Sequence, residues 1–233
     1  MTVTVGILCG MDNERDCLAR VFSEPQFQVF SGNDCRNLPS LVPSSVKLML
    51  DMGLCGGIGP NVHVPDAVIA GTLSHNPTAP VRNLKGVLQS KLIDAASKKN
   101  IALKQVAYFS SGLFNTSDTL KQRIAIYDAQ PDRPEAMSDE TRFADALTTQ
   151  RHLPLQVCRV LSDSRFEDAD LPPAARGQVL KANGSVDAAF LAESLGLDRS
   201  QIPALIKLAS DCVKAMNVLE DLAWAIKPVF LTF

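Results

Sequence analysis

Short apolar runs rich in β-branched residues alternate along the chain with longer segments in which apolar residues recur every three or four positions. The short runs predict buried strands, and the longer periodicity predicts helices that pack one face on a core. The expected strands span Val3–Leu8, Phe27–Phe30, Val46–Met52, Ala67–Leu73, Gln105–Phe109 and Leu155–Leu161. Strands that alternate with helices favour an α/β fold in which a sheet carries helices on both sides.

The expected helices begin after Asp12 and span Ser117–Tyr127, Thr141–Gln150 and much of residues 186–227. Asp12 is a candidate cap for the first of them. In the last, apolar residues from Leu205 to Ile226 form one stripe, which predicts a core-facing side. Because the sequence has no repeat and no long linker, we expect residues 1–233 to form a single domain.

Composition and charge exclude several classes of protein. The 233 residues include 23 Lys plus Arg and 25 Asp plus Glu, which gives a formal net charge of −2. Proteins that bind nucleic acid usually carry a basic surface, so no nucleic-acid partner is expected. No apolar run approaches the roughly 20 residues that cross a bilayer, and the first residues do not resemble a secretion signal. We therefore expect a cytoplasmic protein.

The six cysteines predict neither zinc nor disulfides. None of them forms a C-x-x-C pair, and the three histidines lie at no ligand spacing from them. Most of the cysteines occupy apolar segments, where a free thiol behaves as a small hydrophobic group. We expect reduced thiols and no metal site.

A glycine-rich stretch, Gly53-Leu-Cys-Gly-Gly57, follows the third expected strand. In α/β folds, ligands collect beyond the carboxyl ends of strands, and glycines let backbone amides approach them closely. The stretch lacks the Lys-Ser/Thr of a phosphate-binding loop, and the chain has no G-x-G-x-x-G. It predicts either a ligand-contacting turn or a plain one, and supports neither dinucleotide nor nucleoside triphosphate binding.

Three acidic residues stand just past expected strand ends or at expected helix starts. Glu14 falls in the first turn of the first helix, Glu140 precedes the helix at 141–150, and Asp163 follows the last strand. Each has a purely structural interpretation: a solvated first-turn acid for Glu14 and a capping group for the other two. Each is also a candidate for acid–base chemistry.

Four blocks of sequence keep the order and approximate spacing of one known superfamily. The first is Gly6-Ile-Leu-Cys-Gly-Met-Asp-Asn-Glu14, in which a Glu follows a Met by three residues. The others lie within Met52–Ala70, at Met137-Ser-Asp-Glu-Thr141, and at Leu155-Gln-Val-Cys-Arg-Val-Leu-Ser-Asp163. The set resembles the nucleoside phosphorylases and methylthioadenosine/S-adenosylhomocysteine nucleosidases. This resemblance implies a three-layer sandwich with a mixed central sheet between helices.

The resemblance also implies roles for residues in breaking the N-glycosidic bond of an adenine nucleoside. Asp163 would be the general acid at purine N7, and Glu14 would orient or deprotonate the nucleophile. Glu140 would bind the ribose 2′- and 3′-hydroxyls. The other substrate contacts would be Met11 beside the sugar, Gly57 in the glycine-rich stretch, Arg159 near Glu14 and the nucleophile, and Phe114 against the base. Phe114 is equally a candidate core residue.

Three positions depart from the family pattern. Asp139 puts a carboxylate where the family has a Met that contacts the sugar. Leu54 replaces a Ser or Thr that contacts the nucleophile or phosphate in many members, and Ser111-Gly-Leu lacks an Asp often seen after this Gly. The nucleophile therefore stays open between water and phosphate. Phosphate would be a co-substrate, with Arg36 and Arg82 as candidate ligands, and no other cofactor is expected.

Three C-terminal segments narrow the resemblance: Asp170–Ala175, Ala182–Asp187 and Gln201–Asp211. They resemble the hopanoid-associated branch, linked to removal of adenine from adenosylhopane. A hopanoid-linked nucleoside is the implied substrate; the alternatives are methylthioadenosine or S-adenosylhomocysteine, and a non-catalytic nucleoside-binding protein. A lipid-linked substrate implies peripheral membrane access, with Pro60–Pro65 and Trp224–Phe233 as candidate apolar walls. The resemblance also implies a homodimer.

Overall fold

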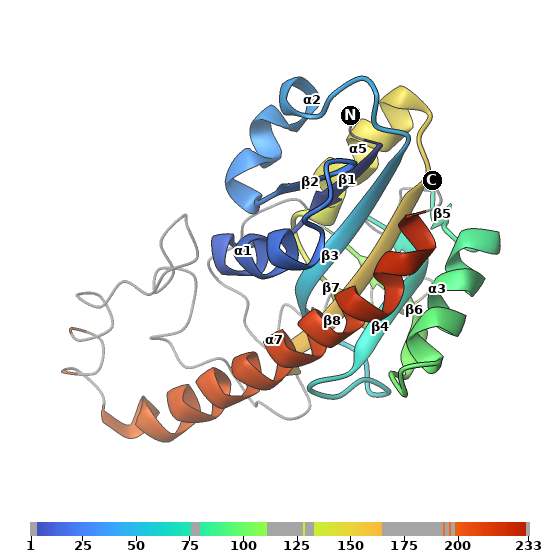
Figure 1. Cartoon of the computed structure of the whole chain (residues 1–233). Coiled ribbons are helices and arrows are strands. Elements are labelled where there is room, and N and C mark those ends of the chain that lie inside the picture. Colours follow the sequence, from blue (N-terminus) through green and yellow to red (C-terminus); the bar gives the residue numbers. More distant parts are fainter. Residues whose placement is uncertain are drawn as a thin grey trace.

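Eight strands in the described part of the chain form one mixed sheet with helices on both faces (Figure 1). The computed structural model describes residues 4–75, 80–110, 133–164 and 199–231, together with positions 128, 193 and 196. The strands are β1 (Val5–Leu8), β2 (Phe27–Phe30), β3 (Leu48–Gly57), β4 (Ala67–Ser74), β5 (Arg82–Asn83), β6 (Leu103–Phe109), β7 (Ala136–Met137) and β8 (Leu155–Ser164). The helices are α1 (Asp12–Val21), η1 (Gly32–Asn37), α2 (Leu38–Leu41), α3 (Val87–Ser97), α5 (Thr141–Arg151), η3 (Arg199–Gln201) and α7 (Ile202–Phe230).

Part of the sheet closes on itself. β3 pairs in parallel with β8, β8 pairs antiparallel with β4, and β4 pairs in parallel with β6. β6 then pairs in parallel with β7, which returns antiparallel to β3. β1 and β2 extend the parallel side beyond β3, and β5 flanks β4. The predicted α/β class and the mixed sheet are both confirmed.

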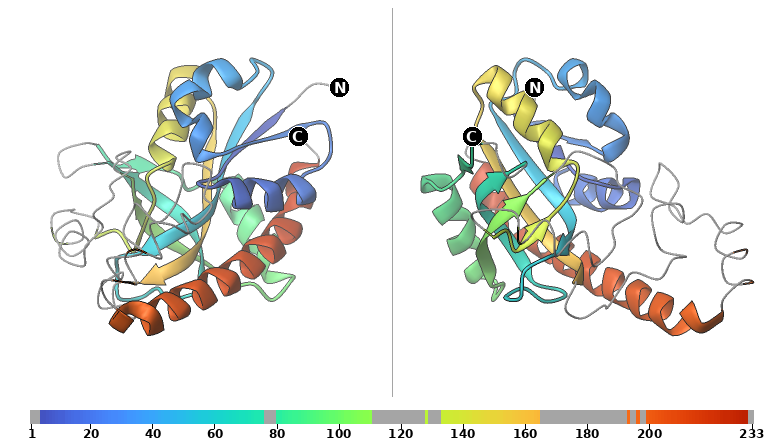
Figure 2. Two further views of the ribbon diagram at one scale, coloured as in Figure 1. Left: turned by 90° about the vertical axis from the view of Figure 1, so that its left-hand side faces the viewer. Right: turned by 180° about the vertical axis from the view of Figure 1, so that it is seen from behind.

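Two hydrophobic cores lie on opposite faces of the sheet. Successive residues of a strand face opposite sides, and β3 shows this clearly. Leu48, Leu50 and Met52 belong to the core beneath α1, α3 and α7, whereas Met49 belongs to the core beneath α2 and α5. Figure 2 shows the two groups of helices on either side of the strands, which is the three-layer arrangement that the resemblance implies.

Strands β3 and β8 run further than the sequence predicts. The stretch Gly53–Gly57 is the second half of β3 and not a turn, because β8 pairs along its whole length and β7 pairs with its end. A register shift between Cys55 and Gly56 interrupts the ladder there. β8 likewise continues to Ser164, so Asp163 lies inside a strand. Mutual pairing of the two strands extended both beyond the limits expected from hydrophobicity.

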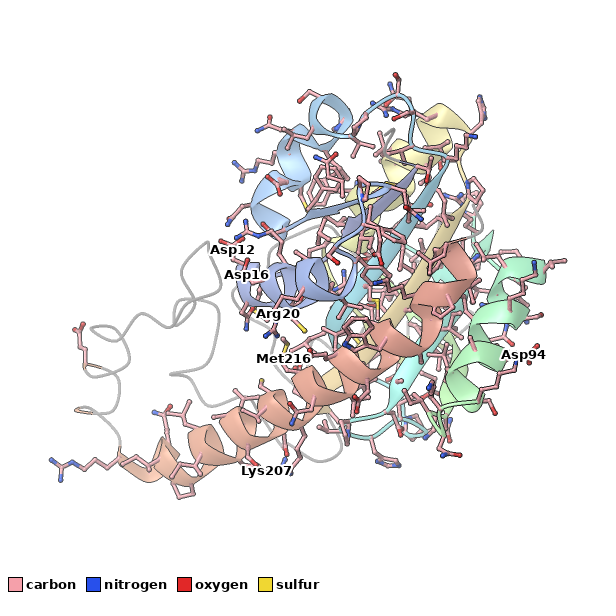
Figure 3. The ribbon with its side chains drawn as sticks, in the orientation of Figure 1. Asp12, Asp16, Arg20, Asp94, Lys207 and Met216 are labelled. Carbon is pink, nitrogen blue, oxygen red and sulfur yellow. The ribbon has the colours of Figure 1, made fainter. Side chains whose placement is uncertain are left out.

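The helices also differ from expectation in detail. Met11, and not Asp12, is the N-cap of α1, and Asp12 is its first residue. The apolar stripe of the last helix is confirmed in its C-terminal half, where Leu219, Leu222 and Ile226 are completely buried. Its first half extends past the sheet, where Lys207 is labelled in Figure 3. The predicted helix Ser117–Tyr127 lies outside the described residues.

All six cysteines are free thiols, and five of them are buried, as expected of small hydrophobic groups in apolar segments. No helix in the described ranges combines the length and the apolar character needed to cross a bilayer.

Candidate active site

Three parallel strands bring the candidate residues to one edge of the sheet. β1, β3 and β8 lie side by side and end in the same direction, so their carboxyl ends meet at this edge. β1 leads through Gly10 into α1, which carries Glu14. Glu140 lies just before α5 and reaches the same edge, as its contact with Arg159 of β8 shows.

Glu14 turns inward from the first turn of α1. Only 1% of this residue is exposed, whereas Asp12, Asp16 and Arg20 of the same helix lie on its outer side (Figure 3). One carboxylate oxygen accepts hydrogen bonds from the backbone N–H groups of Gly10 (2.7 Å) and Met11 (3.3 Å). The other accepts one from the N–H of Leu54 on β3 (3.3 Å). The interpretation of Glu14 as a solvated acid is therefore wrong.

Burial makes Glu14 a weaker acid than an ordinary glutamate. It raises the pKa of Glu14 to about 7, since the charged form loses its water; Arg159 opposes this rise, and the negative charge of Glu140 adds to it. Near neutral pH the carboxyl group is therefore present both with and without its proton. A group balanced in this way can exchange a proton with a bound reactant.

Arg159 is a completely buried cation beside Glu140. Its guanidinium donates to the Leu54 carbonyl (2.8 Å), forms a close ion pair with Asp51, and lies 3.6 Å from a carboxylate oxygen of Glu140. Burial alone would lower the pKa of Arg159, but the surrounding carboxylates raise it well above its usual value, Asp51 most of all. Arg159 is therefore a permanent charge that joins β3, β8 and the start of α5.

Glu140 is the N-cap residue of α5, but its side chain makes no capping hydrogen bond. The side chain is 16% exposed and points toward Arg159 and the β1–α1 turn. A methyl group on Gly10 would lie 3.1 Å from one oxygen of Glu140 and 3.4 Å from one oxygen of Glu14. The two carboxylates thus approach the same glycine, and the capping interpretation of Glu140 is wrong.

Asp163 lies at the same edge, in β8. It is half-buried and pairs in register with Gly56 of β3, which pairs on its other side with Met137. The Ser162 hydroxyl lies 3.4 Å from one of its carboxylate oxygens. Since Asp163 belongs to a strand, its interpretation as a cap after the strand is wrong.

Four other candidate residues were Met11, Gly57, Asp139 and Phe114. Met11 packs half-buried against the core beside α1, and Gly57 lies against Leu161 and the backbone of Asp163. Asp139 is half-buried, and its backbone carbonyl accepts a hydrogen bond from Ser110 (3.1 Å). Phe114 lies outside the described residues.

The arginines proposed as phosphate ligands do not join the cluster around Arg159. Arg82 forms a close ion pair with Asp145 and donates to Thr148 (2.9 Å). Asp145 also forms a hydrogen bond with His75 (2.7 Å). Arg82 is therefore paired with residues of α5 and not with the cluster around Arg159. Arg36 is exposed in η1.

Sequence reasoning missed Asp51, and it included Gly53 only as part of the glycine-rich stretch, without a role beside Glu14. They lie two residues apart on β3 and so face the same side of the sheet, and Gly53 is in register with Arg159. A methyl group on Gly53 would lie 2.4 Å from Glu14 and 3.1 Å from Arg159. A signal for Asp51 was present, since it is a lone acid in the apolar run Leu48–Leu54.

Replacing Gly53 by alanine is expected to displace Glu14, because three backbone N–H groups fix the carboxylate that the new methyl group would strike. Overpacking of this kind costs about 1–3 kcal/mol, which urea denaturation measures. The matched control is Gly86→Ala at the start of α3, where a methyl group meets nothing within 4 Å. Equal stability of the two variants would show that Gly53 is not needed for close approach.

Solved structures of nucleosidases have the same fold. Methylthioadenosine-bound 5′-methylthioadenosine/S-adenosylhomocysteine nucleosidase from Helicobacter pylori (D198N mutant) matches with a TM-score of 0.60 at 14% identity, over 100% of both chains. A futalosine hydrolase mutant from the same organism gives 0.60 at 13% identity, covering 95% of this chain and 98% of that one. The Campylobacter jejuni nucleosidase gives 0.58 at 14%, covering 92% and 98%.

Sequence comparison adds nothing to this likeness. No family model matches the chain, and no curated protein matches it either. At 13–14% identity the solved structures define the fold, which is the α/β fold of the methylthioadenosine nucleosidases and futalosine hydrolase.

Proposed function

We propose that the protein cleaves the N-glycosidic bond of an adenine nucleoside by hydrolysis. The observation that supports this most directly is Glu14, a buried carboxyl with a pKa of about 7, beside Arg159 and Glu140 at the carboxyl edge of β1, β3 and β8. Ligands bind at this edge in α/β folds. Breaking a glycosidic bond requires an acid for the leaving group and a base for the nucleophile.

The proposed mechanism gives each carboxyl group one task. Glu140 accepts hydrogen bonds from the ribose hydroxyls and fixes the sugar. Glu14 takes a proton from the attacking water as the C–N bond lengthens and the sugar gains positive charge. Asp163 gives a proton to purine N7, so that adenine leaves as a neutral base. The water oxygen then forms the new bond to the anomeric carbon.

The charge balance of the site favours water over phosphate as the nucleophile. Among the described residues, Arg159 is surrounded by Asp51, Glu14 and Glu140, so this one cation faces three acidic groups. An incoming phosphate dianion would be repelled by these carboxylates and would find Arg159 already paired with Asp51. The side chain of Leu54, which stands where many members of the resembled family have a Ser or Thr, packs in the core beneath α1, α3 and α7 and supplies no hydrogen-bond donor for a phosphate.

For the 5′ substituent we propose a long apolar group of the hopanoid kind, with methylthioadenosine and S-adenosylhomocysteine as the alternatives. Pro60–Pro65 follows β3 at the edge of the site and is the remaining candidate wall for an apolar tail. The other candidate segment lies elsewhere: Lys227, next to Trp224, contacts Val21 and Glu24 at the end of α1 opposite Glu14.

Incubation with adenosine, methylthioadenosine, S-adenosylhomocysteine and an adenosine bearing a long 5′ alkyl chain tests this proposal. We expect free adenine and a free reducing sugar, at a rate that added phosphate does not change. Adenine released only with phosphate, together with a sugar 1-phosphate, would contradict hydrolysis. The absence of cleavage for all four nucleosides, despite measurable binding, would favour the non-catalytic nucleoside-binding protein.

The same assay decides the 5′ group. Remote binding energy should raise kcat/KM for the long-chain nucleoside if an apolar tail is recognised. Equal kcat/KM for adenosine and the long-chain compound would contradict the hopanoid proposal and leave the general activity intact.

A further inference from the structure

Asp51 is a charged residue in the middle of a core strand. It is completely buried in β3, with Leu50 and Met52, both fully buried, on either side. Removing a carboxylate from water costs several kcal/mol unless charges and hydrogen bonds compensate it. A residue of this kind therefore needs partners that hold it, and these partners define what it does.

Each oxygen of Asp51 has its own partner. One accepts a close hydrogen bond from the Arg159 guanidinium of β8, and the other accepts one from the Thr141 hydroxyl, the first residue of α5. The Thr141 hydroxyl is in turn 2.8 Å from the Ser138 hydroxyl. Asp51 thus connects β3 both to Arg159 and to the residue that follows Glu140.

We propose that Asp51 is a positioning residue that fixes Arg159 and the start of α5 and takes up much of the guanidinium charge. One edge of the guanidinium is held by Asp51, so the other edge is directed at the Leu54 carbonyl and at Glu140. The tasks of Glu14 and Glu140 rest on the proposed function, whereas the contacts of Asp51 do not depend on it.

The pairing of Arg159 with Asp51 also affects the pKa of Glu14. Among the described residues, the charged and titratable groups that face Glu14 are Arg159 and Glu140, with Asp51 behind Arg159 and the thiols of Cys9 in the β1–α1 turn and Cys17 on α1. An unpaired guanidinium beside Glu14 would favour its anion and lower its pKa, which would make the carboxylate a weaker base toward the attacking water. Because Asp51 offsets that charge, Glu14 stays close to its midpoint of titration.

The test is the titration of Glu14 in Asp51→Asn, followed by ¹³C NMR of glutamate carboxyl groups and assigned with Glu14→Gln. Asparagine keeps the shape of the side chain and removes its charge, so the field of Arg159 acts on Glu14 more strongly. We expect the midpoint to fall by about one pH unit or more. Asp16→Asn, on the exposed side of α1, is the matched control and should leave the midpoint in place.

An unchanged midpoint in a folded Asp51→Asn protein would overturn the proposal. If this variant does not fold, because it leaves Arg159 buried without its partner, the double variant Asp51→Asn/Arg159→Gln replaces it. With neither charge present, the midpoint should stay close to the wild-type value, because the charge of Arg159 is removed together with the carboxylate that offsets it. A midpoint displaced by about one pH unit or more would show that the two charges do not offset each other at Glu14, and would overturn the proposal in that case.

Kinetics separate this inference from the proposed function. In an active enzyme, Asp51→Asn should move the acidic limb of the kcat/KM profile downward in pH by the same amount as the NMR midpoint. The NMR titration needs no substrate, so it decides the role of Asp51 even if no nucleoside is cleaved. Conversely, an active enzyme with an unchanged titration in Asp51→Asn would contradict only the role of Asp51.

Discussion

Replacing Asp163 by asparagine is expected to lower kcat by ~10²-fold or more, while nucleoside affinity stays within about tenfold. Asparagine keeps the size of the side chain and can still donate a hydrogen bond to purine N7, but it cannot transfer a proton. The proton is needed as the bond to the base breaks, so the loss falls on the transition state more than on the bound substrate. Steady-state kinetics and equilibrium binding on the same preparation measure the two effects.

Glu140→Gln is the matched comparison for Asp163→Asn. It also removes one carboxylate from the site, but from the group proposed to accept hydrogen bonds from the ribose. A neutral amide is a weaker acceptor than a carboxylate, so we expect poorer nucleoside binding in this variant.

Near-normal turnover in Asp163→Asn would show that another group protonates the base, and the proposed mechanism would fail at its central residue.

Glu14→Gln is expected to stabilise the protein above neutral pH while lowering kcat by ~10²–10⁴-fold. The pKa of Glu14 rises on folding from 4.5 to about 7, so the folded state binds a proton that the unfolded chain has released between these values. Wild-type stability therefore falls as the pH rises from about 4.5 to 7. The shift corresponds to roughly 3 kcal/mol.

Denaturant unfolding of wild type and Glu14→Gln across this pH range measures the effect. Glutamine has no proton to lose, so the difference in unfolding free energy should grow in favour of the variant up to about pH 7 and stay constant above it. Any constant loss from the three backbone N–H contacts affects all pH values equally and does not obscure the trend. A difference that does not change with pH would show that Glu14 titrates normally.

The parts of the fold that local sequence patterns encode were predictable. β1, β2, β4 and the C-terminal half of α7 follow apolar periodicity and lie where it places them. The ends of β3 and β8 were not predictable, because they depend on strands that pair from distant parts of the chain. Helix α3 was also missed, although its apolar residues Leu88, Leu92 and Ala96 recur every four positions and the last two are fully buried.

The clustering of three of the candidate residues was predictable by resemblance, but their contacts were not. Glu14, Glu140 and Arg159 were identified by resemblance, and the structure brings their charged groups together. Nothing in the local sequence shows that Gly53 leaves room for Glu14, since that depends on the register between β3 and β8. For Asp51, hydropathy marks the exception in an apolar strand, but only the tertiary structure shows which cation it meets.

The insertion of β8 between β3 and β4 determines when the site can form during folding. β8 comes late in the chain, whereas its two neighbours come from the first third. Closing so long a loop is entropically slow, so this strand should dock after the local helices and β1 have formed. Until it docks, Asp51 has no cation and the edges of β3 and β4 stay open to other chains. The same strand completes the site and protects the folding chain from aggregation.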